Sequence, residues 1–171
     1  VLNNIQTGIL NLNLEIDFDK INNIKDFELN GVIKKLNAKI DKFDIKDSNF
    51  IFSANKNAAD FNNIIAFING IQINSGNINF DVTNGYLIDG TFNSEFNFDK
   101  KNISKFIKKT KLKNYKKISL SGNLKSVFKL KLDETLKIDN YDFQTNGDLK
   151  KTLISFNKIF ENQYLLEKID K

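Results

Sequence analysis

The stretch LNLNLEIDFD, from Leu10 to Asp19, alternates apolar and polar residues without a break. One set of alternate positions holds only leucine, isoleucine and phenylalanine, and the other holds only asparagine and carboxylates. Successive side chains of a β-strand point to opposite faces, so a period of two predicts a strand with one apolar and one polar face. The stretch therefore predicts a long, half-buried strand.

The same alternation recurs along most of the chain, with Asn, Gly and Asp residues between the runs. Asn84-Gly85 favours a tight hairpin turn, and the segments Asp47–Asn49 and Asn74–Asn77 also indicate turns. A slip in the alternation at Lys34-Lys35 indicates a β-bulge. We expect a mainly β protein in which a long antiparallel meander forms a curved, twisted sheet or groove, as a single domain over residues 1–171.

Two segments break this alternation and account for the one or two short helices that we expect. From Asp60 to Ile68 the apolar residues fall at helical spacing, and Asp60 is a suitable N-cap. From Lys101 to Lys113 the residues Ile103 and Phe106 fall on one helical face.

The composition excludes most enzyme chemistry. The chain has no His and no Cys, and reading the sequence shows no Arg, so all 26 basic residues are lysine. A zinc site of the usual kind, a thiol nucleophile and a Ser-His-Asp triad all need residues that the chain lacks. No glycine-rich phosphate-binding motif occurs either. We expect no enzyme activity, no cofactor and no bound metal.

One acidic group has to be weighed against that expectation. Glu15, Asp17 and Asp19 share the polar face of the first predicted strand. Such carboxylates can act as a general acid and base or bind a hard cation, but no second acidic cluster is placed to complete a site. We interpret them as a solvated strand face.

The chain begins at Val1 rather than at a methionine, and it shows neither a signal peptide nor a long apolar run of the kind that crosses a membrane. We expect it to be a mature chain or a segment of a longer one, with any membrane anchor or targeting signal lying outside it.

A lysine-rich stretch extends from Lys100 to Lys117 and contains no acidic residue. An amphipathic helix here would lie on an anionic membrane surface, where each lysine contributes about 1 kcal/mol. The alternative is a capping helix with a solvated outer face. Nucleic acid is not an expected partner, because the stretch offers few aromatic residues for base stacking. The candidate membrane-surface residues are Lys101, Lys105, Lys108 and Lys109.

The apolar strand faces allow two arrangements. In a closed sandwich they form the core between two sheets. In an open, curved sheet they form a surface that could hold acyl chains. The alternation is the same in both cases.

The order of several motifs resembles that of a known family. These motifs are GILNLNL from Gly8, FELNGV from Phe27, IKDSNF from Ile45, IQINSG from Ile71 and LIDGTF from Leu87. They resemble the AsmA-like proteins of Gram-negative bacteria, particularly the YhdP and TamB branch. The resemblance implies a stretch of a repeating β-groove in a protein that is anchored in the inner membrane, spans the periplasm and carries phospholipid towards the outer membrane.

We therefore hypothesise a non-enzymatic lipid-binding segment, with phospholipid and neighbouring segments of the same chain as partners. The alternative is a structural β-sandwich or solenoid domain that has a closed core and binds a protein partner. The candidate lipid-binding residues are Leu10, Leu12, Leu14, Ile16, Phe18, Phe50, Phe52, Ile78, Phe80, Phe92, Phe96, Phe98, Phe128, Leu130 and Leu132.

Overall fold

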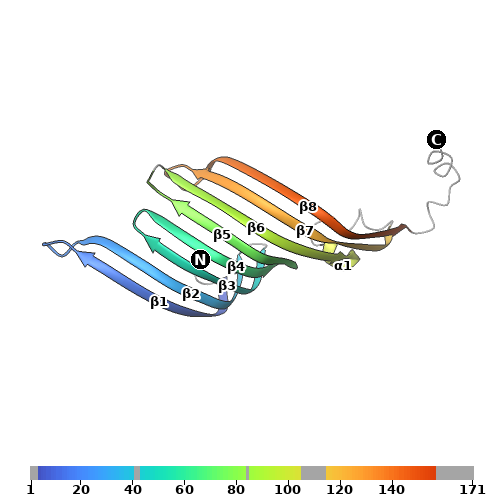
Figure 1. Cartoon of the computed structure of the whole chain (residues 1–171), viewed down its shortest axis with the longest axis horizontal. Helices are drawn as coiled ribbons and strands as arrows, with labels where there is room; N and C mark the ends of the chain where they lie inside the picture. Colours follow the sequence, from blue (N-terminus) through green and yellow to red (C-terminus); the bar gives the residue numbers. More distant parts are fainter. Residues whose placement is uncertain (1–3, 41–42, 84, 105–114, 157–171) are drawn as a thin grey trace. The chain divides into compact units, whose positions relative to one another are not determined.

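The computed structural model describes residues 4–40, 43–83, 85–104 and 115–156. In this part of the chain, eight β-strands form one antiparallel sheet whose order in space is their order in sequence (Figure 1). The sheet is not closed, since β1 and β8 are its two edges, and the predicted meander is confirmed. The elements are β1 (Ile5–Phe18), β2 (Ile24–Ile40), β3 (Phe43–Asn55), β4 (Ala58–Ile68), β5 (Ile71–Asp81), β6 (Tyr86–Asp99), α1 (Lys100–Ile103), β7 (Tyr115–Leu132) and β8 (Ile138–Phe156).

The chain divides into two compact units. The first unit comprises Val1–Glu95 and Leu124–Gly147, and the second comprises Phe96–Asn123 and Asp148–Lys171. The boundary crosses β6, β7 and β8, so each of these strands contributes to both units. The single domain expected over residues 1–171 stays a prediction.

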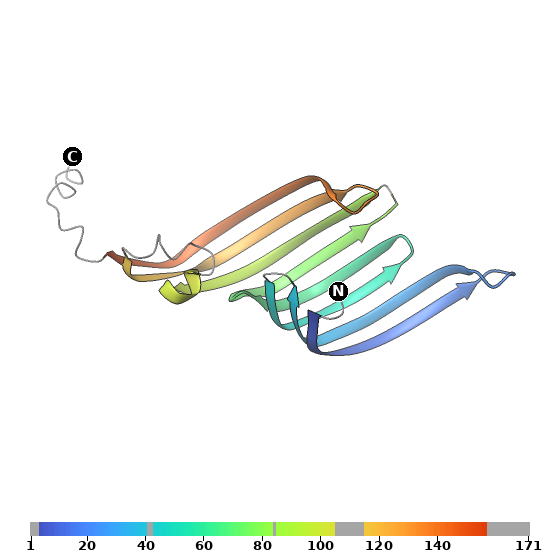
Figure 2. The ribbon, with the colours of Figure 1, turned by 180° about the vertical axis from the view of Figure 1, so that it is seen from behind.

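The strands β1 to β5 form a single layer. Seen from opposite sides, neither face of these strands is covered by a second sheet or a long helix of the described chain (Figures 1 and 2). Accordingly, no large side chain among the described residues is less than 2% exposed. The described residues therefore do not form the closed two-sheet sandwich that the alternation alone allowed.

Three β-bulges interrupt neighbouring strands. Lys35 in β2, Asp47 in β3 and Asn63 in β4 have positive φ angles of 53°, 49° and 56°, and the strand register shifts beside each of them. An extra residue in a strand leaves its N–H outside the ladder. Here each of these N–H groups donates to an asparagine side chain of a neighbouring strand. The distances to the Oδ1 atoms are 3.1 Å from Lys35 to Asn49, 3.2 Å from Asp47 to Asn37 and 3.1 Å from Asn63 to Asn77.

The bulge at Asn63 explains why the helix expected from Asp60 to Ile68 is wrong. This segment lies in β4, and the bulge adds one residue between Phe61 and Ile64. Residues on one face of a regular strand are two apart in the sequence. The extra residue makes Phe61 and Ile64 three apart instead, which is a spacing typical of a helix. The bulge expected at Lys34-Lys35 is confirmed by the conformation of Lys35.

Two of the expected turns are also wrong. Asp47–Asn49 lies inside β3, where Asp47 forms a bulge and Ser48 is buried. Asn74–Asn77 lies inside β5, which runs without interruption from Ile71 to Asp81. The hairpin expected at Asn84-Gly85 falls at the connection between β5 and β6, where Gly85 has a φ of 98° and Asn84 lies outside the described residues. Turn-forming residues thus also occupy strand interiors in this chain.

The turns from odd-numbered to even-numbered strands share one design. Each has an Asp or Asn at or next to the end of the first strand, whose side-chain oxygen accepts a backbone N–H two residues on. These residues are Asp19, Asn55, Asp81 and Asp133.

These hydrogen bonds lower the pKa of the turn carboxylates. For Asp19 the larger contribution comes from the backbone N–H of Asn23 and the next from that of Ile21. The hydroxyl of Thr83 and then its N–H lower the pKa of Asp81.

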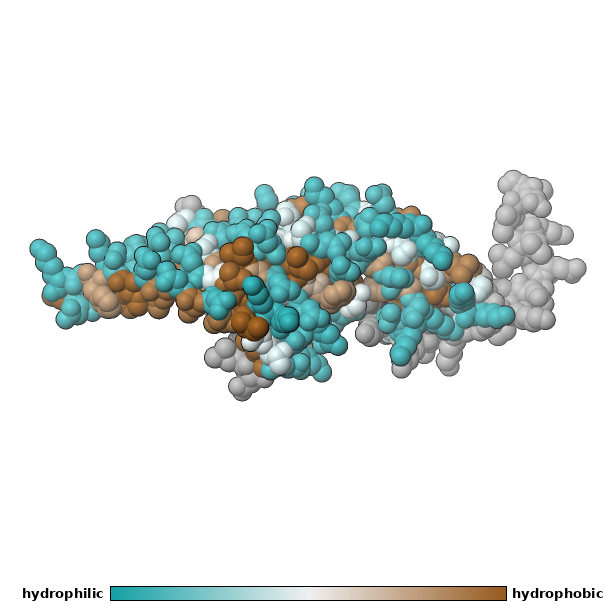
Figure 3. All heavy atoms as spheres, turned by 60° about the horizontal axis from the view of Figure 1, so that its bottom comes forward, coloured by the Kyte–Doolittle hydropathy of each residue, from teal (hydrophilic) through white to brown (hydrophobic). Residues whose placement is uncertain are grey.

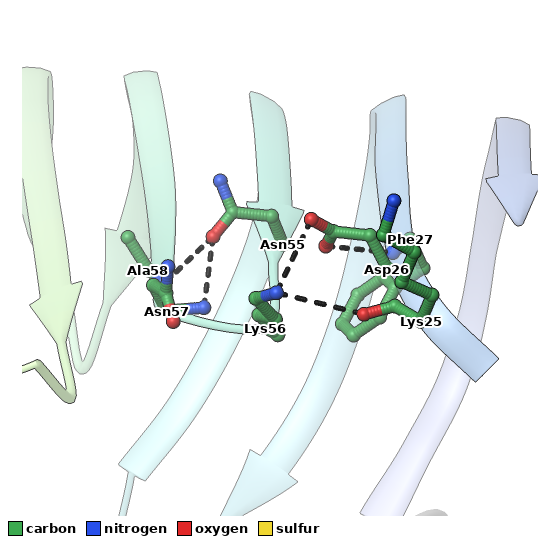
Figure 4. A network of polar contacts seen from close by, with 7 residues as sticks. All are labelled: Lys25, Asp26, Phe27, Asn55, Lys56, Asn57 and Ala58. Atoms are coloured by element: carbon green, nitrogen blue, oxygen red, sulfur yellow. Dashed lines mark hydrogen bonds and ion pairs between the residues drawn. The ribbon is translucent and has the colours of Figure 1, made fainter. Parts of the chain in front are cut away.

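The β3–β4 turn is also attached to the neighbouring strand (Figure 4). The Asn55 side chain accepts the N–H groups of Asn57 and Ala58 at 2.8 and 3.0 Å. The ammonium group of Lys56, at the tip of the turn, lies 3.4 Å from the carboxylate of Asp26 in β2. An exposed pair of this kind contributes less than about 1 kcal/mol, so it orients the turn rather than stabilising the sheet strongly.

Phenylalanine rings lie over glycines of adjacent strands. A Cβ atom on Gly31 would lie 2.5 Å from the Phe52 ring, one on Gly76 would lie 2.3 Å from the Phe92 ring, and one on Gly90 would lie 2.5 Å from the Phe128 ring. A ring that lies over a glycine buries apolar area at a strand position that has no side chain of its own. The register is continuous through Gly31 on both sides, so no bulge interrupts the ladder at this residue.

The second unit contains a small core. Ile103 of α1 packs with Ile118 of β7, and Phe98, Tyr115 and Leu120 surround them. Asp99 caps the helix by accepting the N–H of Asn102 at 2.7 Å. The helix expected over residues 101–113 is therefore observed only in the short α1, because residues 105–114 lie outside the described residues.

We predict that Gly31→Ala destabilises the protein by about 1–3 kcal/mol, because the new methyl group would overlap the Phe52 ring and the backbone oxygen of Asn11. Urea denaturation measures the effect. Gly8→Ala is the matched control, since its Cβ would lie 3.3 Å from the nearest atom, the terminal methyl of Leu36. Equal stability losses in the two variants would contradict the packing of Phe52 over Gly31.

We predict that the turn carboxylate of Asp133 makes stability depend on pH. The hydroxyl of Thr135 and then the N–H of Lys137 lower the pKa of Asp133 from its usual 3.8. The carboxylate therefore stabilises the fold fully above pH 3.8, and this contribution is lost as the pH falls through the lower pKa of the folded state.

Asp133→Ala should accordingly lower the urea midpoint at pH 7, and its difference from wild type should shrink in acid. Glu134→Ala removes a carboxylate from the same turn and should leave the midpoint nearly unchanged at both pH values. A difference for Asp133→Ala that does not change with pH would contradict the stabilising role of the carboxylate.

Candidate functional site

Apolar residues form continuous rows across the first five strands. Residues directly opposite each other in neighbouring strands point to the same face of a sheet. The strand register therefore places the following residues on one face, which we call the apolar face. One row is Leu12, Gly31, Phe52, Phe61 and Ile78, and the next is Leu14, Leu29, Ala54, Ala59 and Phe80.

Ring contacts extend the apolar face over β6 and β7. Phe92 covers Gly76, which lies two residues before Ile78 and so on the same face. Phe92 in turn stacks on Phe128 of β7, with ring centroids 5.9 Å apart and planes inclined by 12°. Phe80 stacks on Tyr86 at 6.3 Å across the β5–β6 hairpin. The apolar face is thus continuous from β1 to β7 within the first unit.

Residues of the edge strand β8 continue the apolar face. The hydroxyl groups of Ser126 and Thr145 lie 2.9 Å apart, which puts Thr145 on the face of Phe128. Tyr141 and Phe143 precede Thr145 at alternate positions, so they belong to the apolar face as well.

Over β1 to β5, the side chains of the apolar face are flanked by neighbours in the same sheet, and no second layer of the described chain lies over them. Inside the sheet, Phe52 is 8% exposed because side chains of the adjacent strands flank it. At the β1 edge, Leu12 is 52% and Phe18 is 59% exposed. Figure 3 shows hydrophobic residues gathered along one side of the β1–β2 end of the sheet, with hydrophilic residues on the other side. Isolated exposed apolar residues are ordinary, but a contiguous exposed apolar face marks a binding surface.

The structure brings most of the predicted lipid-binding residues to this face. Phe96 and Phe98 follow Phe92 at alternate positions of β6, but they belong to the second unit and are described with it. Phe98 packs beside the Ile103–Ile118 core there, and Phe96 stacks on Phe98 at 5.2 Å. Those on the apolar face of the first unit are Leu10, Leu12, Leu14, Ile16, Phe18, Phe50, Phe52, Ile78, Phe80, Phe92, Phe128, Leu130 and Leu132.

Several residues of the apolar face were missing from that prediction. Leu29 takes part in the alternation of its own strand, which could have identified it. Phe61 was assigned to a helix because of the Asn63 bulge, and its place beside Phe52 follows only from the strand register. Tyr141 and Phe143 could have been found from their alternation in β8.

The opposite face of β1 to β5 is largely polar. Its central row is Asn13, Asn30, Ser53, Asp60 and Asn79. Beside this row lies a shallow depression of about 210 Å³, whose lining includes Glu28, Asn30, Ser53 and Asp60. The sheet is therefore amphipathic, with one apolar face and one largely polar face.

The acidic residues of the first strand lie on this polar face and in the turn between β1 and β2. Glu15 lies opposite Glu28, Asp17 lies opposite Asp26, and Asp19 belongs to the turn. Among the described residues, no group of three acidic side chains is close enough together to hold a metal ion. Their interpretation as a solvated strand face agrees with the exposure of Glu15 and Asp17.

The candidate membrane-surface lysines are only partly described. Lys101 is exposed on α1, while Lys105, Lys108 and Lys109 lie outside the described residues. Within the described residues, no helix is both long and apolar enough to cross a membrane.

Comparison with known proteins adds no relative. No protein-family model, no curated protein and no solved structure matches this chain.

We predict that the native protein binds a hydrophobic dye such as ANS, because the apolar face is exposed at β1. Leu14→Asn should reduce the dye fluorescence with little loss of stability, since Leu14 is half exposed. Asn13→Ser, on the polar face of the same strand, should leave the fluorescence unchanged. A native protein that does not increase dye fluorescence would contradict an open apolar face.

Proposed function

We propose that this protein is a non-enzymatic lipid-binding segment, in which the apolar face holds the acyl chains of phospholipid. The observation that carries the proposal is the pair of apolar rows across β1 to β5, with no second layer over them in the described structure. Exposing such an apolar surface to water costs free energy, and covering it with hydrocarbon chains removes that cost.

The energetics support acyl chains as the occupant. Each buried CH₂ group contributes about 0.8 kcal/mol, so a chain of ordinary length gains several kcal/mol from lying along the face. The two rows across β1 to β5 consist of glycine, alanine, aliphatic and aromatic residues, with no polar side chain that would select one particular ligand shape. Binding would therefore be passive and tolerant of acyl-chain structure.

The headgroups would remain in water at the rim of the sheet. The ends of the strands carry asparagine, aspartate and lysine, as in the turn formed by Asn55, Lys56 and Asn57. A lipid with its chains on the apolar face and its headgroup at such a rim buries no charge.

The resemblance to AsmA-like proteins supplies the cellular setting of this proposal. In that setting the chain is one stretch of a longer protein that is anchored in the inner membrane and spans the periplasm. Neighbouring segments of the same chain would continue the groove, and phospholipid would move along it between the inner and outer membranes. The lysine-rich stretch would contact the anionic membrane surface.

The test is to purify the protein without detergent, extract it with organic solvent and identify phospholipid by mass spectrometry. We expect phospholipid at near-stoichiometric amounts in the wild type. Phe80→Asp and Leu130→Asp place a charge on the apolar face and should each abolish lipid retention.

Asn79→Asp is the matched control for Phe80→Asp, because it adds the same charge to the polar face of the same strand. It should retain lipid as the wild type does. Circular dichroism shows that each variant is folded. Full retention by a folded Phe80→Asp variant would contradict acyl-chain binding on this face.

A further inference from the structure

The bulges at Lys35 and Asp47 are joined by a closed set of hydrogen bonds. The N–H of Lys35 donates to Asn49 Oδ1 at 3.1 Å, and the N–H of Asp47 donates to Asn37 Oδ1 at 3.2 Å. In return, Asn49 Nδ2 donates to the carbonyl oxygen of Asp47 at 2.7 Å. Asn37 Nδ2 lies 3.3 Å from the carbonyl oxygen of Lys35 and 2.7 Å from Thr7 Oγ1 of β1. We call Lys35, Asn37, Asp47 and Asn49 the asparagine ring.

The ring joins two conformations that are each unfavourable alone. Lys35 and Asp47 have φ angles of 53° and 49°, in the left-handed region that costs free energy for most residues other than glycine. A bulged residue also leaves backbone groups without a partner in the ladder. Each asparagine accepts the N–H of the bulge in the neighbouring strand and donates to the carbonyl of the bulge in its own strand. Loss of either asparagine therefore removes a hydrogen bond from both bulges.

Both asparagine side chains lie on the polar side of the sheet. Ser48, two residues before Phe50, belongs to the apolar face, so its neighbour Asn49 points to the opposite face. Leu36 lies opposite Ser48 in the strand register, so Asn37 also points to the polar face. A molecule on the apolar face does not contact either asparagine, and any effect of the ring on that face passes through the backbone.

The apolar face is almost fully buried beside the ring. Ala38 in β2 and Ser48 in β3 are 3% and 5% exposed, although no second layer of the described chain lies over these strands. A bulge bends its strand, and two bulges in adjacent strands bend both strands at the same place. Figure 2 shows the start of β1 and the adjoining ends of β2 and β3 turned away from the line of the strands.

We propose that the asparagine ring is a latch, which holds the two bulges as one unit and keeps the apolar face bent around Ala38 and Ser48. Asn37 and Asn49 are then positioning residues of the apolar face, on the side of the sheet that a ligand does not touch. The latch is a property of the protein alone, and it rests on the proposed function only where it concerns lipid.

The first test is a double-mutant cycle of Asn37→Ala and Asn49→Ala, measured by urea denaturation. Because either substitution opens the ring, the double variant should raise the unfolding equilibrium constant by less than the product of the single effects, with a coupling of roughly two- to tenfold. Asn77 accepts the N–H of the separate Asn63 bulge, so Asn77→Ala combined with Asn37→Ala should give the product of the single effects. Independent effects of Asn37→Ala and Asn49→Ala would overturn the latch.

The second test measures the shape of the apolar face in the native, delipidated protein. Ser48→Cys and Ser94→Cys place thiols at two serines that are 5% and 6% exposed, one beside the ring and one in β6. Adding Asn37→Ala should speed the reaction of the thiol at position 48 with a water-soluble reagent roughly tenfold, through local opening, and leave position 94 unchanged. Asn30→Ala, on the polar face of the same strand and outside the ring, should change neither rate.

Two outcomes of the thiol measurement would overturn the latch. Equal acceleration at positions 48 and 94 would show that Asn37→Ala only lowers the overall stability. No acceleration at position 48 would show that the face keeps its shape without the ring.

A lipid measurement separates the latch from the proposed function. Asn37→Ala should retain less phospholipid than the wild type, whereas Asn30→Ala should retain the same amount. A wild type without phospholipid would contradict the proposed function, while the thiol rates and the mutant cycle would still decide the latch. Unchanged lipid retention in Asn37→Ala, with a faster thiol at position 48, would overturn the role of the latch in lipid binding.

Discussion

The structure depends on one constraint: a sheet of a single layer has to cover its apolar side chains with neighbours from the same layer. In a two-layer protein the facing layer does this. Here Phe52, Phe92 and Phe128 instead lie over Gly31, Gly76 and Gly90 of the adjacent strands. Each ring buries apolar area that a single-layer sheet would otherwise leave in water. Side chains are well buried in the middle of the sheet and half exposed at β1, which is an edge strand of the sheet in the described residues.

The asparagines give the sheet a second kind of support. The bulges at Lys35, Asp47 and Asn63 leave N–H groups outside the ladder, and side chains such as that of Asn77 accept them. A bulge bends its strand and increases its twist. Adjacent bulges in β2, β3 and β4 can therefore bend the sheet without leaving backbone donors unsatisfied. A bent, amphipathic sheet with one polar and one apolar face is suited to hold hydrocarbon on one side and water on the other.

The strand alternation made the meander predictable, because period two holds over long runs such as Leu10–Asp19. It failed where a bulge changed the spacing, as at Asn63, and where a turn-forming residue served a strand, as Gly76 does beneath Phe92. The composition of the apolar face was largely predictable for the same reason. Whether that face was covered could not be predicted, since alternation is identical in an open sheet and a closed sandwich. Strand register and the absence of a second layer in the described residues supply that answer.

The most direct test of an uncovered apolar face uses the absence of cysteine from the chain. Single cysteines at Leu14, on the apolar face, and at Asn13, on the polar face, would each be reacted with a water-soluble thiol reagent in the delipidated native protein. Ala66→Cys is the buried reference, because Ala66 is only 2% exposed. We expect the thiols at positions 14 and 13 to react at similar rates and the thiol at position 66 to react far more slowly. Protection of position 14 to the level of position 66 would show that the apolar face is covered and would contradict the open sheet.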